Sequence, residues 1–467
     1  MSAPGLASLG SVCRALGVDE EGGGVQGLAN SPIAAISPIA AIVTDTRRVA
    51  ADTLFVALKG ERFDAHDFIA KAREGGAVAA VVEHPVDDPL PQLVVGDTRM
   101  ALGLLARERR RAWGGPLVAV TGNSGKTTVK QMLATLLARQ GETLATHGNL
   151  NNDIGAPLTL LALASDHQRA VVELGANHLG EIAWTVALAE PQVAIITNVT
   201  GAHVGEFGGM GRIAQAKGEI LGGLGPEGVA VLNRDDRYFS LWQRLASPRE
   251  VIDFGLTPEA RLHAGELVCD TLGRYAFTLT FDAQVLGRVE LPLMGRHNVS
   301  NALAAAAGAL AMGLPAADVV AGLGEVVPTP GRLTVEEGLR GARLLDDTYN
   351  ANPGAMKAAI DALLGLPGPH WCLLGAMGEL GEASADLHAE IGRYARERGI
   401  TFLGTLGEAA ETAARAFGEG GYHFSDQAAM VRHVRQHLPE AASVLVKGSR
   451  AAGMEGVVAA LRPDVSR

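Results

Sequence analysis

The chain alternates short apolar runs with longer stretches in which apolar residues recur every three or four positions. Apolar runs occur at 53–58, 77–82, 117–120, 170–174, 192–197, 228–232, 343–346, 371–374, 401–403 and 443–446. Such runs, separated by helical patterns, are typical of strands in a mainly parallel sheet whose crossover connections are helices. The pattern therefore predicts an α/β protein.

Breaks in this pattern predict three domains. We expect a small α/β domain over residues 1–112, a central domain with a mainly parallel sheet over 113–327, and a Rossmann-like domain over 328–467. The last boundary is marked by Pro328, Pro330 and Gly331, which interrupt regular structure. The third domain has no G-x-G-x-x-G motif, so the sequence does not indicate dinucleotide binding there.

A glycine-rich segment follows the apolar run at 117–120. Gly122-Asn-Ser-Gly-Lys-Thr-Thr128 opens an amphipathic stretch over 129–139. A strand, a glycine-rich turn and a helix N-terminus place backbone N–H groups around nucleotide phosphates. Lys126 adds a positive charge for the outer phosphates, and Thr127 adds a hydroxyl for Mg²⁺. Val120 replaces the first glycine of the usual Walker pattern, so we interpret the loop as a shortened variant that binds ATP or GTP.

Polar residues follow the next apolar runs. Because ligands gather at the carboxyl ends of parallel strands, Glu173 and His203 are candidate ligands for a metal bound with the nucleotide. Taken singly, Glu173 is better explained as a helix-capping carboxylate and His203 as a surface loop histidine; together they favour ligands. The asparagines of Asn149-Leu-Asn151-Asn152-Asp-Ile-Gly155 fit ordinary turn chemistry or the orientation of an anionic substrate, and spacing does not decide between them.

Composition excludes several classes of protein. The net charge of −11 argues against general nucleic-acid binding, and we interpret the one basic cluster, 107–111, as a solvated helix end near a domain junction. Cys13, Cys269 and Cys372 are far apart, which fits reduced thiols and no zinc site. The sequence shows no secretory signal, and its longest apolar stretch, 302–314, is too short to span a bilayer. We expect a cytoplasmic protein without membrane insertion.

A series of polar and glycine-containing motifs runs along nearly the whole chain. They are Thr44-Asp-Thr-Arg47, 60–68, the glycine-rich loop, Gly148-Asn-Leu-Asn-Asn-Asp-Ile-Gly155, 173–178, Asn198-Val-Thr-Gly-Ala-His203, Lys217-Gly-Glu219, Gly295-Arg-His-Asn-Val-Ser-Asn301, Asp346-Asp-Thr-Tyr-Asn-Ala-Asn-Pro353, 375–381 and Lys447-Gly-Ser-Arg450. Together these motifs resemble those of the bacterial Mur ligases. The resemblance implies an N-terminal domain that holds the UDP end of the substrate, a central ATPase domain and a C-terminal domain that takes the incoming amino compound.

The motif over 346–353 resembles that of the dipeptide-adding branch of the family. This implies an ATP-dependent amide ligase that joins D-Ala-D-Ala to UDP-MurNAc-tripeptide through an acyl phosphate, the last cytoplasmic step of peptidoglycan precursor synthesis. We expect a monomer. The alternatives are another ligase of the superfamily, of the diaminopimelate-adding or folylpolyglutamate type, and a nucleotide-gated binding protein. The third residue of the tripeptide, lysine or diaminopimelate, stays open.

The resemblance also implies roles for individual residues. Those implied to bind ATP are Gly122, Asn123, Ser124, Gly125, Lys126, Thr127, Thr128, Asn298, Arg332 and Asp347. Those implied in catalysis are Lys126, Asn149, His203 and Lys217, and those implied to serve Mg²⁺ are Thr127, Glu173, His203 and Lys217. Those implied to bind the substrates are Thr44, Asp45, Thr46, Arg47, Asp64, His66, Asn151, Asn152, Tyr349, Asn350, Lys447 and Arg450. Spacing alone would make Lys217 an ordinary exposed helix lysine, whereas the resemblance implies that it is carbamylated.

Overall fold

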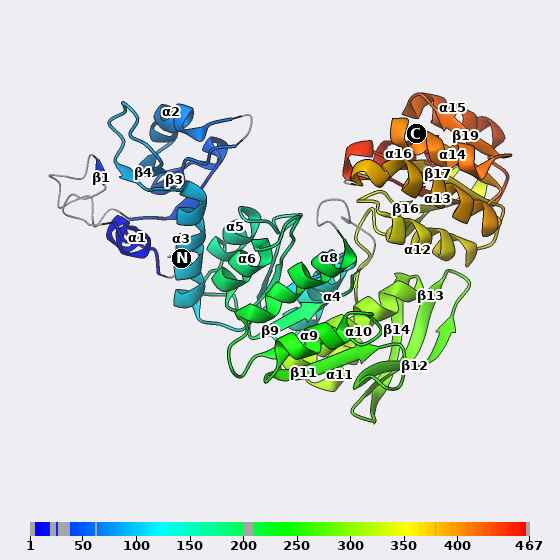
Figure 1. Cartoon of the computed structure of the whole chain (residues 1–467), viewed down its shortest axis with the longest axis horizontal. Coiled ribbons are helices and arrows are strands. Elements are labelled where there is room, and N and C mark those ends of the chain that lie inside the picture. The colour runs from blue at the N-terminus through cyan, green and yellow to red at the C-terminus, as the bar shows by residue number, and fades with distance from the viewer. Residues whose placement is uncertain are drawn as a thin grey trace.

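The computed structural model describes residues 5–18, 25–26, 38–60, 63–199, 209–378 and 380–463. Its strands form three sheets, of five, nine and six strands. In Figure 1 the N-terminal and C-terminal parts lie at opposite ends of the long axis, with the nine-stranded part between them. The predicted α/β class with mainly parallel sheets is confirmed, whereas the domain limits at 112 and 327 stay predictions.

The N-terminal sheet has the order β1-β5-β4-β3-β2, and its strands are parallel except for the β1–β5 pair. Its strands are β1 (Val25–Gln26), β2 (Ala41–Val43), β3 (Thr53–Val56), β4 (Ala77–Val82) and β5 (Gln92–Val94), and its helices are α1 (Leu9–Leu16), α2 (Ile69–Glu74) and α3 (Thr98–Trp113). Helix α3 is capped by the Asp97 carboxylate, which accepts from the backbone N–H groups of Arg99 and Met100. It leads into the central domain and packs on α5 and α6.

The central sheet has the order β14-β13-β12-β11-β10-β9-β6-β8-β7. Its strands are β6 (Leu117–Thr121), β7 (Thr143–Ala145), β8 (Arg169–Glu173), β9 (Val193–Ile196), β10 (Val229–Asn233), β11 (Glu250–Gly255), β12 (Leu262–Cys269), β13 (Arg274–Phe281) and β14 (Gln284–Met294). Its helices are α4 (Lys126–Ala138), α5 (Gly155–Leu161), α6 (Glu181–Ala189), α8 (Met210–Gly218), α9 (Phe239–Ala246), α10 (Arg296–Ala311) and α11 (Ala316–Gly324). Strands β7 to β12 pair in parallel, whereas β13 and β14 add an antiparallel edge.

Both faces of this sheet are buried, as expected of a parallel sheet covered by helices. On β6, Val118 and Val120 enter the core shared with α4 and α10, and Leu117 and Ala119 enter the core shared with α5, α6 and α8. The carboxyl end of β6 is therefore fixed at the middle of the sheet, where the glycine-rich loop begins.

The C-terminal sheet has the order β15-β16-β20-β17-β18-β19, and β15 alone is antiparallel to its neighbour. Its strands are β15 (Thr334–Glu337), β16 (Arg343–Asp347), β17 (His370–Gly375), β18 (Phe402–Leu406), β19 (Gly421–Phe424) and β20 (Ser443–Lys447). Helices α12 (Pro353–Leu364), α13 (Ser384–Glu397) and α14 (Glu411–Phe417) cover one face, and α15 (Gln427–His437) and α16 (Glu455–Leu461) cover the other. Among the described residues, no helix is both long and apolar enough to cross a membrane.

Candidate active site

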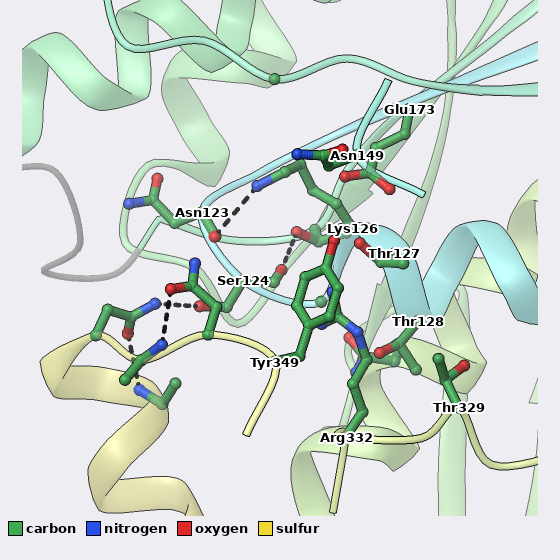
Figure 2. Close-up of a pocket in the computed structure, with 18 of the residues that line it drawn as sticks. Asn123, Ser124, Lys126, Thr127, Thr128, Asn149, Glu173, Thr329, Arg332 and Tyr349 are labelled. Atoms are coloured by element: carbon green, nitrogen blue, oxygen red, sulfur yellow. Dashed lines mark hydrogen bonds between the residues drawn. The ribbon is translucent and has the colours of Figure 1, made fainter. Parts of the chain in front are cut away.

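A cavity of about 1030 Å³ lies where the central domain meets the C-terminal domain. Central residues that line it include Asn123 to Thr128, Asn149, Asn151, Asn152, Glu173 and Asn298, and C-terminal residues include Arg332, Asp347, Tyr349, Asn350, Lys447 and Arg450. Figure 2 shows Lys126, Thr127, Asn149 and Glu173 near one another, with Arg332 and Tyr349 approaching from another segment. Two sets of sequence-predicted residues, from before and after the predicted boundary at 327, thus share one cavity.

The glycine-rich loop is fixed by its conformation and by the end of β9. Gly122 and Gly125 have φ values of 146° and 82°, and a Cβ atom on Gly122 would lie 1.9 Å from Thr197 Oγ1. The Thr197 hydroxyl donates to the Ser124 carbonyl at 2.7 Å, and the Asn198 side chain accepts from Ser124 N–H at 3.0 Å. Both glycines are therefore required where the sequence places them.

Lys126 is the first residue of α4, with its ammonium turned back over the loop. Its Nζ donates to the Gly122 carbonyl at 2.8 Å and to the Asn123 carbonyl at 3.3 Å, and Figure 2 shows the second of these contacts. The backbone N–H groups at this helix N-terminus and the charge of Lys126 lie on one side of the cavity. This arrangement favours phosphate groups.

Glu173, the last residue of β8, is 2% exposed. Its Oε1 accepts from Asn151 Nδ2 at 2.8 Å, and its Oε2 lies 3.7 Å from Lys130 Nζ. Burial lowers the pKa of Lys130, while the negative charge of Glu173 opposes that shift. Asn149 also lines the cavity, and Asn152 accepts from Gly155 N–H at 2.8 Å, so this asparagine both lines the cavity and shapes its own turn.

Lys217 near the end of α8 is 3% exposed and donates to the Ala176 carbonyl at 3.4 Å. Ala176 lines the cavity, so Lys217 lies just behind the cavity wall. Burial, and then the positive charge of Lys126, lower the pKa of Lys217 to about 7. Glu219 ties this segment to α6 by accepting from Gly180 and Ala183 N–H groups. His203, the other predicted ligand from this region, lies outside the described residues.

The C-terminal side of the cavity presents paired side chains. The Arg332 guanidinium lies over the Tyr349 ring, 4.0 Å from its centroid. Lys447 at the end of β20 pairs with Asp347 at the end of β16 at 2.5 Å and donates to the Asn350 carbonyl at 2.8 Å. Arg450 lies 3.8 Å from Glu455. Asn298, from the central domain, donates to the Met294 carbonyl at 2.7 Å at the start of α10.

The predicted UDP-site residues lie in the N-terminal domain and do not line this cavity. Asp45 accepts from the Arg47 guanidinium at 2.6 Å, and that contact is the largest cause that lowers the pKa of Asp45 to about 2. Thr44 and Thr46 flank Asp45, and Thr46 begins a short 3-10 helix, Thr46–Arg48. His66 is 3% exposed and uses both ring nitrogens, one with Asp64 at 2.5 Å and one accepting from Glu83 N–H at 2.9 Å.

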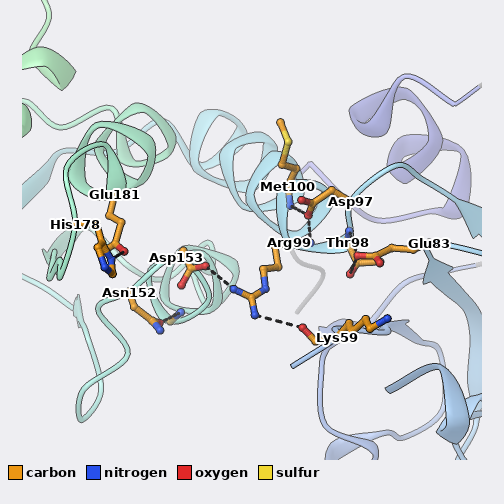
Figure 3. A network of polar contacts seen from close by, with 11 residues as sticks. Lys59, Glu83, Asp97, Thr98, Arg99, Met100, Asn152, Asp153, His178 and Glu181 are labelled. Carbon is orange, nitrogen blue, oxygen red and sulfur yellow. Dashed lines mark hydrogen bonds and ion pairs between the residues drawn. The ribbon is translucent and has the colours of Figure 1, made fainter. Parts of the chain in front are cut away.

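A polar contact joins the N-terminal domain to the loop that contains the asparagines. Figure 3 shows the Arg99 guanidinium between the Asp153 carboxylate, at 3.2 Å, and the Lys59 carbonyl, at 3.3 Å. Further along α3, Arg109 and Arg110 are buried and donate to the carbonyls of Leu163 and Ala189 in the central domain. The prediction that the cluster at 107–111 is solvated is therefore wrong for these two residues.

The chain matches three models of one family. They are the catalytic domain of the Mur ligase family at residues 38–110, the Mur ligase middle domain at 120–309, and the glutamate ligase domain of Mur ligases at 331–450. The chain is 44% identical over 429 residues to the UDP-N-acetylmuramoyl-tripeptide–D-alanyl-D-alanine ligase of Escherichia coli, an alignment that covers 91% of this chain and 94% of that protein. The chain belongs to the Mur ligase family. The ligase of the same name from Bacillus subtilis is 32% identical over 93% of this chain and 95% of its own length.

Solved Mur ligase structures share this fold. A crystal structure of MurF from Acinetobacter baumannii matches with a TM-score of 0.90 and 38% identity, covering 98% of this chain and 99% of that one. MurF from Thermotoga maritima in complex with ADP matches with a TM-score of 0.81 and 30% identity, covering 90% of this chain and 96% of that one. These matches confirm the expected family and its three-domain architecture, while the roles of individual residues stay predictions.

Sequence reasoning missed several residues that this Mur ligase uses to build the cavity. Lys130 is buried beside Glu173. The helical pattern around Lys130 does not predict this contact, because Glu173 lies on a different element. Thr197 and Asn198 hold the glycine-rich loop. Both lie directly after a strand next to β6, and Asn198 also begins the Asn198–His203 motif, but neither signal indicates that they hold the loop. Asn301 lies close to Gly125: a Cβ atom on Gly125 would be 2.3 Å from Asn301 Oδ1.

Proposed function

We propose that this Mur ligase joins D-Ala-D-Ala to UDP-MurNAc-tripeptide and converts ATP to ADP and phosphate. The observation that carries the proposal is the shared cavity, in which the glycine-rich loop faces the 346–353 segment and Lys447. The relatives named for this reaction align with more than nine-tenths of the chain, so the motifs of all three domains are included in the similarity.

The proposed reaction has two chemical steps. A carboxylate of the tripeptide attacks the γ-phosphorus of ATP, which gives an acyl phosphate and ADP. The amine of D-Ala-D-Ala then attacks the acyl carbon, and a tetrahedral intermediate expels phosphate. Lys126 and the N-terminus of α4 would stabilise the charge on the transferring phosphoryl group, because both lie at the loop that would hold the phosphates. Asn149 would contact the reacting groups from the cavity wall.

We assign the remaining roles by domain. Arg332 would contact a phosphate and Asp347 the ribose, and Asn298 would lie near the adenine. The incoming dipeptide would be bound by Tyr349, Asn350, Lys447 and Arg450. The tripeptide of the UDP-linked substrate would be bound by Asn151 and Asn152. The N-terminal residues Thr44 to Arg47, Asp64 and His66 would hold the UDP end. We infer a monomer that works in the cytoplasm, where ATP and UDP-linked precursors are available.

The residues at the loop fit a magnesium ion. Thr127 offers a hydroxyl, and Glu173 offers a carboxylate whose Oε2 has no hydrogen-bond partner within the described chain although it is buried. Oxygen ligands of this kind are the ones that Mg²⁺ prefers. Mg²⁺ held by Thr127, Glu173 and His203 would supply further neutralisation of the phosphate charge.

We further propose that Lys217 is carbamylated. The neutral amine and CO₂ would form a carbamate with release of one proton, which replaces an ammonium near Lys126 by an anionic oxygen ligand. Burial and the nearby charge of Lys126 support this, because they bring the pKa of Lys217 to about 7 and keep a large neutral fraction near neutral pH. At a fixed CO₂ pressure the carbamate should increase as pH rises through 7.

Carbamylation can be tested with ¹³C-labelled CO₂. The wild-type enzyme should show a carbamate carbon resonance that is absent from Lys217→Ala and that weakens below pH 7. Lys217→Ala should lose activity, and acetate or formate should restore part of it by filling the vacated position. An active Lys217→Ala enzyme, or a wild-type enzyme without the resonance, would contradict carbamylation.

The reaction is tested by incubating the chain with UDP-MurNAc-tripeptide, D-Ala-D-Ala, ATP and Mg²⁺. Mass spectrometry should show a UDP product enlarged by the dipeptide minus one water, with one ADP per product. Tripeptides with lysine or diaminopimelate at position three are compared in parallel. Product formed only with a single amino acid would favour another ligase of the superfamily, and ADP without any enlarged product would favour a nucleotide-gated binding protein.

A further inference from the structure

Lys130 lies one helical turn after Lys126 and is buried, at 4% exposure. Its Nζ donates to the Thr146 carbonyl at 2.7 Å and lies 3.7 Å from Glu173 Oε2. Burying an ammonium group is costly unless it is paired and hydrogen-bonded, and helix packing alone needs only an apolar side chain at such a position. The contacts of Lys130 therefore point to a role in holding its partners.

The partners of Lys130 also contact each other, at the ends of strands β7 and β8. Thr146, directly after β7, accepts from Glu173 N–H through its hydroxyl at 2.9 Å and from Lys130 through its carbonyl. Asn151 donates to Glu173 Oε1 at 2.8 Å and accepts from Gly175 N–H through its carbonyl at 2.7 Å. The Glu173 carboxylate is thus held at Oε1 by an amide and approached at Oε2 by Lys130.

This geometry leaves the two carboxylate oxygens in different states. Oε1 has a hydrogen-bond donor, whereas Oε2 has an ion-pair contact that is too long for a hydrogen bond. An ammonium at that distance orients the carboxylate without occupying the lone pairs of Oε2. A direct hydrogen bond from Lys130 would compete with a metal ion for this oxygen.

We propose that Lys130 is a positioning residue that fixes the Glu173 carboxylate so that Oε2 can bind Mg²⁺ together with the nucleotide. The inference rests on the proposed magnesium site at Thr127 and Glu173. Lys130 itself touches neither metal nor substrate in this scheme; it acts through Glu173 and through the Thr146 carbonyl. Groups that orient metal ligands in this way commonly change metal affinity tenfold to a hundredfold when they are replaced.

The test compares ADP binding with and without Mg²⁺ by titration calorimetry. In wild-type enzyme Mg²⁺ should tighten ADP binding. In Lys130→Met that gain should shrink about tenfold or more, while ADP affinity in EDTA stays at the wild-type value. Lys130→Arg should recover part of the gain, because it keeps the charge and a donor. Lys357→Met is the matched control, since Lys357 also pairs with a carboxylate, Glu390, at 2.6 Å but in the C-terminal domain.

A second comparison keeps the inference separate from folding defects. In the Glu173→Gln background, adding Lys130→Met should leave the Mg²⁺ dependence unchanged, because the group that Lys130 positions is already altered. An unaltered Mg²⁺ gain in Lys130→Met, an increased gain, or an equal loss of ADP affinity with and without Mg²⁺ would each overturn the inference. If the ADP affinity of the wild-type enzyme is the same with and without Mg²⁺, the proposed magnesium site itself is wrong.

Discussion

The central domain meets its two neighbours in different ways. Toward the N-terminal domain, α3 packs on α5 and α6, and Arg109 and Arg110 reach buried carbonyls of the central domain. Toward the C-terminal domain the boundary is a cavity of about 1030 Å³, lined by many charged and polar side chains together with apolar ones such as Leu293, Val326 and Leu380. Asn352 donates to Ser124 Oγ across it at 3.5 Å.

Because of this difference, we expect the first boundary to contribute mainly to the stability of the fold and the second mainly to ligand binding and catalysis. A packed boundary whose buried arginines donate to carbonyls of the neighbouring domain resists movement, whereas a cavity between two domains can close around a ligand and exclude water. We therefore expect substitutions at the first boundary to change the free energy of unfolding and substitutions at the second to change nucleotide binding or turnover. Four sets of substitutions test this expectation.

Lys126→Ala should have the largest effect. It removes the charge placed at the phosphate loop, and kcat should fall about a hundredfold or more, as for the loss of other preorganised groups that stabilise a transition state. Thermal unfolding should stay near that of the wild type, because Lys126 contacts loop carbonyls and is not packed in the core. A variant with near-normal kcat would remove Lys126 from the mechanism.

Arg110→Met should show the opposite pattern. It leaves the Ala189 and Glu190 carbonyls without the donors that reach them at 2.7 Å and 3.0 Å. Unsatisfied buried acceptors cost about 1–3 kcal/mol of stability, which urea unfolding can measure. Arg111→Met is the control, because Arg111 is half exposed and pairs with the Glu190 carboxylate. If Arg110→Met lowers kcat and leaves stability unchanged, the two boundaries do not differ as proposed.

Tyr349 tests the cavity side more finely. If its ring orients Arg332 for a phosphate, Tyr349→Ala should raise KM for ATP by a factor that matches a cation–π contact of about 0.5–2 kcal/mol. Tyr349→Phe keeps the ring and should keep the wild-type KM for ATP. A rise in KM for D-Ala-D-Ala alone, in Ala and Phe variants alike, would limit Tyr349 to the dipeptide role proposed above and contradict a role in orienting Arg332.

The sequence predicts features that depend on local patterns and misses those that depend on contacts between distant segments. Buried strands such as β6, β8 and β16 follow from apolar runs, because a parallel sheet covered on both faces needs them. The antiparallel edge of β13 and β14 was not predicted, since its half-exposed strands give only weak alternation. The sequence pattern places Lys126 at the start of a helix. The burial of Lys130, in contrast, depends on two residues at strand ends, Thr146 and Glu173, which lie 16 and 43 residues further along the chain.

The Arg99–Asp153 pair should have the smallest effect, although it joins two domains. The two side chains are 47% and 35% exposed, so water and salt screen the attraction at 3.2 Å. A double-mutant cycle with Arg99→Ala and Asp153→Ala should give a coupling of about 0.2–1 kcal/mol in the free energy of unfolding, and less at high salt. KM for the UDP-linked substrate is measured on the same variants. If the coupling is small but that KM rises in both single variants, the pair sets the position of the N-terminal domain relative to the Asn149–Gly155 loop, and the packed boundary also contributes to substrate binding.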